Sequence, residues 1–219
     1  MNDHSILNKI AILEPFVSAH KKETIEQVLA NRTDYLTILL EDILQAHNAS
    51  AVLRSADCFG VQNVHVIEDK HAFKPITTID RGSSKWLTLH KYKKAKSAIE
   101  SLKEQNYKII ATTPNRHAVS LPSFNLSEKI CLVFGTEWTG ISEFVQEHAD
   151  GFLTIPMFGF TESFNISVSV SVVLYDLVTK LHNTDLDWHL SHEAKNALTL
   201  TWYKQIVRAS GQILKRYSR

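Results

Sequence analysis

Three short segments combine polar side chains with apolar surroundings in a way that local structure explains poorly. The first, residues 47–57, is an otherwise apolar helical stretch with Asn48 near its start and Arg54 in its body. Asn48 has an ordinary explanation as a helix N-cap. The guanidinium of Arg54 must instead reach solvent, an acid such as Asp57, or an anionic ligand. Arg54 is therefore a candidate for anion binding or charge stabilisation.

The other two segments follow apolar runs that read as strands. Residues 132–142 run into a turn that carries two glycines and one carboxylate, with Gly135 and Glu137 directly after the strand. Residues 155–165 form another strand end that enters a loop with apolar walls and polar tips. Ligands of open α/β sheets bind at the carboxyl ends of strands. Such loops suit a flat, partly apolar ligand recognised by backbone groups.

The sequence does not contain the motifs of several other classes of enzyme. The seven glycines form neither a GxGxxG fingerprint nor a Walker loop, which excludes the usual cradles for dinucleotides and ATP. No GxSxG or Cys/His signature indicates a hydrolase. Among the eleven histidines, the group at residues 185–193 lacks the HExxH order and reads better as a surface cap, so we expect no metal site.

Short β-branched runs alternate with helical patterns along the middle of the chain. Strands are predicted over residues 36–40, 63–67, 86–90, 107–113, 130–134 and 152–155, and helices over 49–59, 93–105 and 140–149. The repeated βαβ order predicts an α/β fold with a mainly parallel sheet and helices on both faces. Residues 165–178 alternate apolar and polar, which favours a strand, although Ser163 or Asn165 as an N-cap would permit a helix.

The two ends of the chain differ from this middle. Residues 1–33 read as helical with a break at Pro15, and a second helical segment begins near Ser191. We therefore expect a domain over 34–182 with helical extensions at 1–33 and 183–219. With 44% hydrophobic and 21% charged residues, a core of this size needs no disulfide. We expect Cys58 and Cys131 to be buried and reduced, and the protein to be cytoplasmic, without a signal peptide or membrane span.

A net charge of +1 conceals an uneven distribution. Residues 81–99 and 194–219 each hold six of the 24 Lys and Arg residues and no acid. Tryptophan and tyrosine are interleaved with these cations, as expected where bases stack or phosphates are held. Two such segments suit a polyanion, although a solvated helix face has the same pattern, and charge alone leaves the two readings about equal.

The three polar segments, in this order and spacing, resemble the three motifs of the SpoU branch of the SPOUT methyltransferases. The resemblance rests on Asn48 and Arg54 six residues apart, on the G-x-E-x-x-G-[IV]-S turn from Gly135, and on the I-P-M-x-G-x-x-x-S-x-N-[IV]-S-V segment from Ile155. It extends from about residue 34 to residue 177. It implies an α/β domain with a deep C-terminal trefoil knot, a helix at 165–178, and a homodimer.

The activity that the resemblance implies is S-adenosylmethionine-dependent 2′-O-methylation of a ribose in tRNA, at guanosine-18 of the D-loop. The alternatives are a ribosomal RNA 2′-O-methyltransferase and a non-catalytic RNA-binding protein of the same fold. The residues carried over as catalytic are Asn48, Arg54, Glu137, Ser163 and Asn165, and those around the cofactor are Thr112, Gly135, Ile155 and Phe164. The cations expected to hold tRNA are Arg54, Lys204, Arg208, Lys215 and Arg216, with Lys21, Lys22 and Arg32 of the N-terminal helix.

The resemblance implies that Arg54 activates the ribose 2′-hydroxyl. A guanidinium stays protonated at neutral pH, so Arg is a poor base there. Either an RNA phosphate helps to accept the proton while Arg54 organises the site, or Arg54 stabilises the developing alkoxide electrostatically. We favour the electrostatic role.

Overall fold

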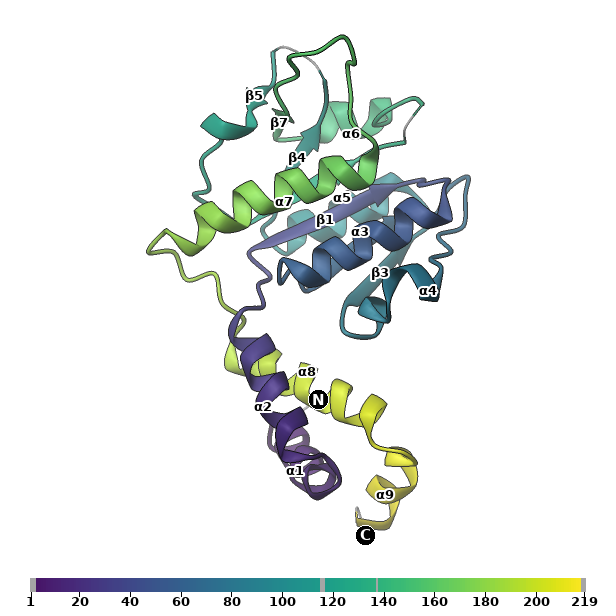
Figure 1. Cartoon of the computed structure of the whole chain (residues 1–219), viewed down its shortest axis with the longest axis vertical. Coiled ribbons are helices and arrows are strands. Elements are labelled where there is room, and N and C mark those ends of the chain that lie inside the picture. The colour runs from purple at the N-terminus through teal and green to yellow at the C-terminus, as the bar shows by residue number, and fades with distance from the viewer. Residues whose placement is uncertain (1–2, 115–116, 137, 218–219) are drawn as a thin grey trace. The chain divides into compact units, whose positions relative to one another are not determined.

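The computed structural model describes residues 3–114, 117–136 and 138–217. The chain forms two compact units (Figure 1). The α/β unit spans Thr33–Trp188, and the helical unit combines the residues up to Arg32 with those from His189 onward. In the described part of the chain, no helix is long and apolar enough to cross a membrane.

The α/β unit is built on a seven-stranded sheet whose paired strands all run parallel. The strands are β1 (Leu36–Glu41), β2 (Asn63–Ile67), β3 (Thr88–Tyr92), β4 (Lys108–Thr112), β5 (Val119–Ser120), β6 (Ile130–Phe134) and β7 (Gly151–Thr154). Their order across the sheet is β3-β2-β1-β6-β4-β7-β5. The chain builds outward from β1 to β3 and then continues on the other side of β1, so β1 and β6 lie where the strand order reverses. Ligand sites of open α/β sheets occur at such a reversal.

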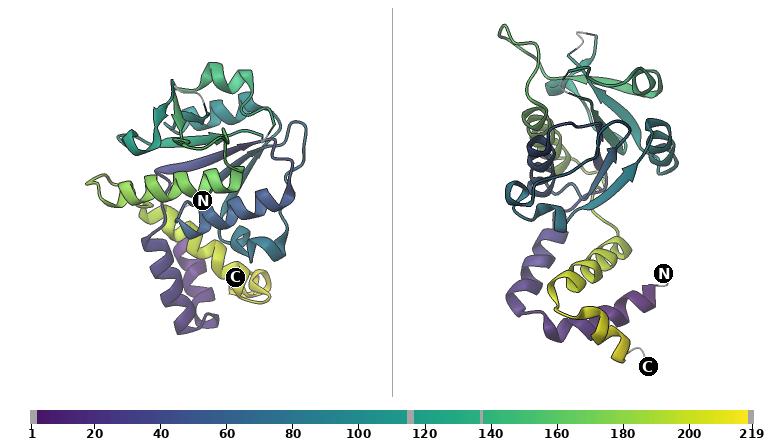
Figure 2. Two further views of the ribbon diagram at one scale, coloured as in Figure 1. Left: turned by 45° about the horizontal axis from the view of Figure 1, so that its top comes forward. Right: turned by 90° about the vertical axis from the view of Figure 1, so that its right-hand side faces the viewer.

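Helices cover both faces of this sheet (Figure 2). The α3 (Ala46–Cys58) and α7 (Ile166–His182) helices lie on one face, and α5 (Ala95–Glu104) and α6 (Glu143–His148) lie on the other. Alternate residues of β1 enter the two cores: Ile38 and Leu40 pack on the α3 and α7 side, and Leu39 on the α5 and α6 side. The expected α/β fold with a parallel sheet covered on both faces is confirmed. Three short helices complete the unit: α4 (Thr77–Asp80), η2 (Ser83–Lys85) and η3 (Leu121–Ser123).

The segment at 165–178 is a helix, so its alternating pattern predicted the wrong structure. Asn165 is the N-cap of α7, and its side chain accepts a hydrogen bond from the Ser167 amide. Ser171 lies where α7 packs closely on α3: its Oγ is 2.8 Å from the Oγ of Ser55. Ser171 also donates to the carbonyl of Ser167 within the helix, at 2.8 Å. A small hydroxyl side chain can thus lie at a contact between two helices. In a strand with the same alternation, it would face solvent.

Two other expectations need correction. The third strand covers Thr88–Tyr92 and not residues 86–90, because residues 83–85 form a 3₁₀ helix with Trp86 as its C-cap. Cys131 is buried as expected, but Cys58 is exposed at the end of α3. Both cysteines are free thiols.

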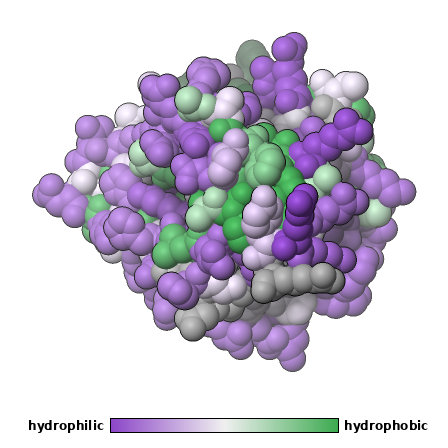
Figure 3. Space-filling view, turned by 90° about the horizontal axis from the view of Figure 1, so that it is seen from below, coloured by the Kyte–Doolittle hydropathy of each residue, from purple (hydrophilic) through white to green (hydrophobic). Residues whose placement is uncertain are grey.

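The helical unit joins the two ends of the chain. Its elements are α1 (Asp3–Leu13), η1 (Glu14–Phe16), α2 (Ala19–Ala30), α8 (His192–Ile206) and α9 (Ser210–Tyr217). The α1 helix packs against both α8 and α9. Ser191 caps α8 through a hydrogen bond from the Ala194 amide, and a left-handed residue, Ala209, precedes α9. The large exposed apolar residues of this unit are Leu7, Phe16, Val28 and Tyr217. Figure 3 shows one face of the molecule, on which apolar side chains gather.

Arg32 is part of the core of the helical unit. Its side chain is 1% exposed, and its guanidinium carbon lies 5.7 Å from the centroid of the buried Trp202 ring. A buried cation stacked on an aromatic ring stabilises the fold. The expectation that Arg32 contacts RNA is therefore wrong.

Candidate functional site

The parallel sheet brings the three polar segments to one edge. The α3 helix begins shortly after the carboxyl end of β1, residues 135–142 follow β6, and residues 155–165 lead from β7 into α7. In the sheet, β1 lies beside β6 and β4 lies between β6 and β7. The segments are therefore neighbours in space although they are far apart in sequence.

A chain of hydrogen bonds joins the first and third segments. The Nδ2 of Asn165 donates to Oδ1 of Asn48 at 3.2 Å, across 117 positions of sequence. Asn48 in turn donates to Oε1 of Gln45 at 3.1 Å, and Oδ1 of Asn165 accepts from the amide and the hydroxyl of Ser167 at 2.9 and 2.7 Å. Asn48 is 2% exposed, so this network fixes its amide in one orientation. The α3 N-cap is Gln45, so the cap explanation of Asn48 is wrong.

The loop after β6 closes on itself. Thr136 and Gly140 exchange two backbone hydrogen bonds of 2.9 and 3.0 Å, and the Thr139 amide donates to the Thr136 hydroxyl at 3.0 Å. A Cβ atom on Gly135 would lie 2.1 Å from the carbonyl carbon of Gly140, so only glycine fits there. Glu137, expected to be catalytic, lies outside the described residues.

Three of the four residues expected around a cofactor lie at neighbouring strand ends, and Phe164 lies shortly before α7. Thr112 ends β4, Gly135 follows β6, and Ile155 follows β7. The Thr112 hydroxyl donates to the Val133 carbonyl at 2.8 Å, so its hydroxyl is engaged within the sheet. Ile155 packs against the core and Phe164 is 44% exposed. Apolar surface next to backbone groups at strand ends is the chemistry that an adenine ring requires, so these residues fit the expected cofactor.

Arg54 is exposed on α3, apart from the Asn48 network. Six residues separate it from Asn48, which places it about 9 Å further along the helix and on a different face. Within the described residues, Arg54 forms neither a hydrogen bond nor an ion pair, so it does not pair with Asp57. The guanidinium therefore faces solvent, where an anionic group can reach it.

Ser163 is exposed in the loop before α7. The N-cap of that helix is Asn165, so the reading of Ser163 as a cap is wrong. The structure thus brings Asn48 and Asn165 together, and leaves Arg54 and Ser163 outside their network.

Nearby acids pair with much of the first basic segment: three of its lysines pair with acids that follow β2, and a fourth lies near an acid within α5. Lys91 and Lys93 lie 2.8 and 3.5 Å from the Glu68 carboxylate, Lys94 pairs with Asp69, and Lys96 lies 3.8 Å from Glu100. The hydrogen bond from Lys91 is the main cause of a lowered pKa at Glu68. This segment is therefore less basic than its composition indicates. Of the helical-unit cations expected to hold tRNA, Lys204, Arg208, Lys215 and Arg216 are exposed.

Two residues of the site escaped the sequence analysis. Gln45 orients Asn48, and Glu41 at the end of β1 accepts a hydrogen bond from the Ser142 amide at 2.9 Å. A signal for Glu41 was present, because a carboxylate that ends an apolar strand must be offset by a partner. No comparable signal marks Gln45.

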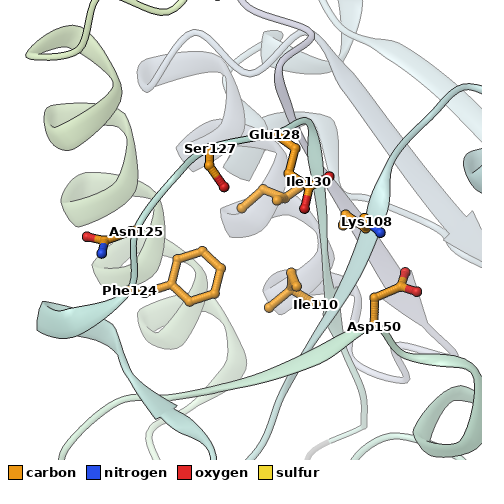
Figure 4. A pocket seen from close by; sticks show the side chains of 8 residues that line it. All are labelled: Lys108, Ile110, Phe124, Asn125, Ser127, Glu128, Ile130 and Asp150. Carbon is orange, nitrogen blue, oxygen red and sulfur yellow. The ribbon is translucent and has the colours of Figure 1, made fainter.

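A cavity of about 150 Å³ lies away from this edge (Figure 4). It is lined by Lys108, Ile110, Phe124, Asn125, Ser127, Glu128, Ile130 and Asp150. Lys108 and Ile130 are the first residues of β4 and β6, so the cavity lies at the opposite ends of these strands from Thr112 and Gly135. It is therefore not part of the site. The described residues also contain no group of three or more His, Cys, Asp or Glu side chains placed to hold a metal ion.

Comparison with known proteins agrees with this geometry. Residues 35–175 match the SpoU rRNA Methylase family. The chain is 44% identical over 208 residues to the tRNA (guanosine(18)-2′-O)-methyltransferase of Borreliella burgdorferi, covering 94% of each chain, and 30% identical over 160 residues to the enzyme of that name from Escherichia coli K12, covering 73% of this chain and 70% of the other. The crystal structure of the A. aeolicus TrmH/SpoU tRNA modifying enzyme superimposes with a TM-score of 0.77 at 27% identity, covering 85% of this chain and 96% of that one. The chain therefore belongs to the SpoU rRNA methylase family.

Proposed function

We propose that the protein transfers a methyl group from S-adenosylmethionine to the ribose 2′-hydroxyl of guanosine-18 in tRNA. The observation that carries this proposal is the similarity to the Borreliella burgdorferi tRNA (guanosine(18)-2′-O)-methyltransferase, which extends over 94% of both chains. The similarity thus includes residues of the helical unit as well as the SpoU core. A shared core alone would support the reaction class, whereas similarity in the helical unit also supports the substrate.

The methyl donor is S-adenosylmethionine, which SpoU methyltransferases use. When bound, it supplies an electrophilic methyl group on a sulfonium. We assign its binding to Thr112, Gly135, Ile155 and Phe164. Because the Thr112 hydroxyl already donates to Val133, Thr112 would contact the cofactor through its methyl group or backbone.

We assign charge stabilisation at the ribose oxygen to Arg54. Its exposed guanidinium can approach RNA, and a permanently charged donor stabilises an alkoxide better than it removes a proton. Asn48 and Asn165 act as positioning groups, since the hydrogen bonds around them hold both amides in place. Glu137 and Ser163 complete the set by their places in the family motifs.

The helical unit is proposed to hold the tRNA backbone. Lys204, Arg208, Lys215 and Arg216 are exposed on it, and phosphate contacts by such cations set affinity more than sequence preference. We further propose a homodimer that uses α7, where Val168 and Tyr175 are 43% and 64% exposed. The cytoplasm, where tRNA is processed, is the proposed location. The trefoil knot stays a prediction of the family resemblance.

The test uses the purified protein, tritiated S-adenosylmethionine and an unmodified tRNA transcript, with Arg54→Ala and Arg54→Lys beside the wild type. We expect methyl transfer by the wild type and a loss of more than about 100-fold in kcat for Arg54→Ala, the usual effect of removing one preorganised charge-stabilising donor. Near wild-type turnover by Arg54→Lys would contradict a role for the guanidinium fork. Cofactor binding without transfer to tRNA would point to ribosomal RNA, and loss of both would favour a non-catalytic RNA-binding protein.

A further inference from the structure

Glu41 places a buried carboxylate at the carboxyl end of the central strand β1. Its side chain is 6% exposed. The strand register pairs Leu40 with Phe134, so Glu41 lies level with Gly135, the first residue of the loop after β6. Burying an ionised carboxylate costs free energy unless hydrogen bonds or charges offset it. A buried carboxylate at the sheet edge where the cofactor is proposed to bind therefore needs a hydrogen-bond or charge partner.

The hydrogen bond of Glu41 identifies what it holds. Its Oε2 accepts from the backbone amide of Ser142 at 2.9 Å. Ser142 is the N-cap of α6, and the preceding residue, Ile141, is buried in the core below α5 and α6. The carboxylate thus fixes the point at which the loop after β6 ends and α6 begins.

The rest of the loop is held by contacts within itself. The Thr136–Gly140 backbone pair closes it, and the close approach of Gly135 to Gly140 leaves no space for a side chain. These contacts hold Gly135 and Thr136 close to Gly140. The bond from Glu41 to Ser142 ties this part of the loop to the neighbouring strand. Without it, the loop keeps its internal bonds but loses an anchor to β1.

We propose that Glu41 is a positioning residue for the methyl-donor site, whose carboxylate holds the Gly135–Ser142 loop in the geometry that binds S-adenosylmethionine. This inference rests on the proposed function, because it takes the loop as part of the cofactor site. Glu41 acts through the Ser142 amide. Removal of the Glu41 carboxylate releases the loop. The free-energy cost of ordering the loop then weakens cofactor binding.

The chain offers a matched control in Glu68. This glutamate directly follows β2, its side chain is 10% exposed, and its Oε1 accepts from the Phe73 amide at 3.0 Å. It therefore anchors a loop after a neighbouring strand by the same kind of hydrogen bond, and it also pairs with Lys91 and Lys93. That loop, residues 68–76, contains none of the proposed cofactor residues.

The experiment measures S-adenosylmethionine affinity by calorimetry, urea unfolding, and the kcat and cofactor KM of methyl transfer. We expect Glu41→Ala to weaken cofactor affinity about 10- to 100-fold and to raise the cofactor KM, as loss of a hydrogen bond to a charged acceptor does. Glu68→Ala should stay within about twofold of the wild type in affinity. Glu41→Gln, which keeps an acceptor oxygen, should recover most of the affinity. Equal affinities in Glu41→Ala and Glu68→Ala would overturn the proposal.

A second pair of variants decides the question if Glu41→Ala does not fold. Ser142 has φ −65°, which proline adopts, so Ser142→Pro removes the donating amide. Ser142→Ala keeps that amide and removes only the cap hydroxyl. Weaker cofactor binding by Ser142→Pro than by Ser142→Ala supports the proposal, and equal binding refutes it. A wild-type protein that does not bind S-adenosylmethionine would refute the proposed function instead.

Discussion

Replacing Gly135 with alanine tests whether the loop after β6 depends on the close crossing of two backbone segments. A Cβ atom at this position would lie 2.1 Å from the carbonyl carbon and oxygen of Gly140, and 2.3 Å from the amide nitrogen of Ile141. All three are backbone atoms, so no side-chain rotation can relieve the overlap. One segment must move by more than about 1 Å to regain van der Waals separation.

The size of the effect follows from what that movement breaks. The backbone hydrogen bonds between Thr136 and Gly140 are 2.9 and 3.0 Å long, and a shift of this size removes both. Two such bonds contribute about 1 kcal/mol each, and overpacking costs about 1–3 kcal/mol, so we expect Gly135→Ala to lower the free energy of unfolding by about 3–5 kcal/mol. The displaced loop should also lose most of its affinity for S-adenosylmethionine.

Urea unfolding followed by circular dichroism measures the first effect, and calorimetric titration with S-adenosylmethionine measures the second. Gly140→Ala is the control, because Gly140 has φ 66° but a Cβ there meets nothing within 4 Å. Its cost is backbone strain alone, about 1–2 kcal/mol. The reasoning is refuted if Gly135→Ala is as stable as the wild type, or loses less stability than Gly140→Ala.

Three further predictions follow from contacts elsewhere in the two units. Asn48→Ala and Asn165→Ala should each lower the free energy of unfolding in urea. The loss in the double variant should differ from the sum of the two single losses by about 0.5–3 kcal/mol, and strict additivity would show that their hydrogen bond contributes no stability. Burial, and then the neighbouring His90, lower the pKa of His65 to about 3. Below about pH 6.5, His65 therefore binds a proton in the unfolded chain but not in the folded chain. As the pH is lowered from 6 to 4, the free energy of unfolding should fall by roughly 1 kcal/mol per pH unit. An undiminished pH dependence of stability in a His65→Leu variant would contradict this origin. In the helical unit, replacing both Lys215 and Arg216 with alanine should weaken tRNA binding and reduce the salt-dependence slope by about 1–2, without changing cofactor affinity; an unchanged slope in a filter-binding titration would remove this surface from the RNA site.

Sequence reasoning predicted those parts of the fold whose signal is local. The strands at 63–67 and 130–134 have the predicted bounds because each is a short run that contains β-branched residues and is flanked by polar residues. The pattern failed at 165–178, where serines alternate with valines. That alternation is a strand signal only if the serines face solvent, and here Ser171 lies at the contact between α3 and α7.

Pairing between distant segments could not be predicted from local signals. Nothing near Asn48 indicates that its partner lies 117 residues away, and only the family resemblance grouped the two. Likewise, the two chain ends each looked like a separate extension, because the apolar faces of α1 and α8 carry no information about each other. The ion pairs of Lys91, Lys93 and Lys94 depend on acids that follow β2, so a basic segment in sequence became a partly neutralised surface.

The central claim is that the protein methylates one ribose hydroxyl of tRNA, and the most direct test changes that hydroxyl alone. Two otherwise identical tRNAs would carry either ribose or 2′-deoxyribose at guanosine-18, and each would be incubated with the protein and labelled S-adenosylmethionine before nucleoside mass analysis. The account predicts 2′-O-methylguanosine at position 18 of the ribose form and no transfer to the deoxy form. Equal methylation of both tRNAs, or label at another nucleotide, would contradict it.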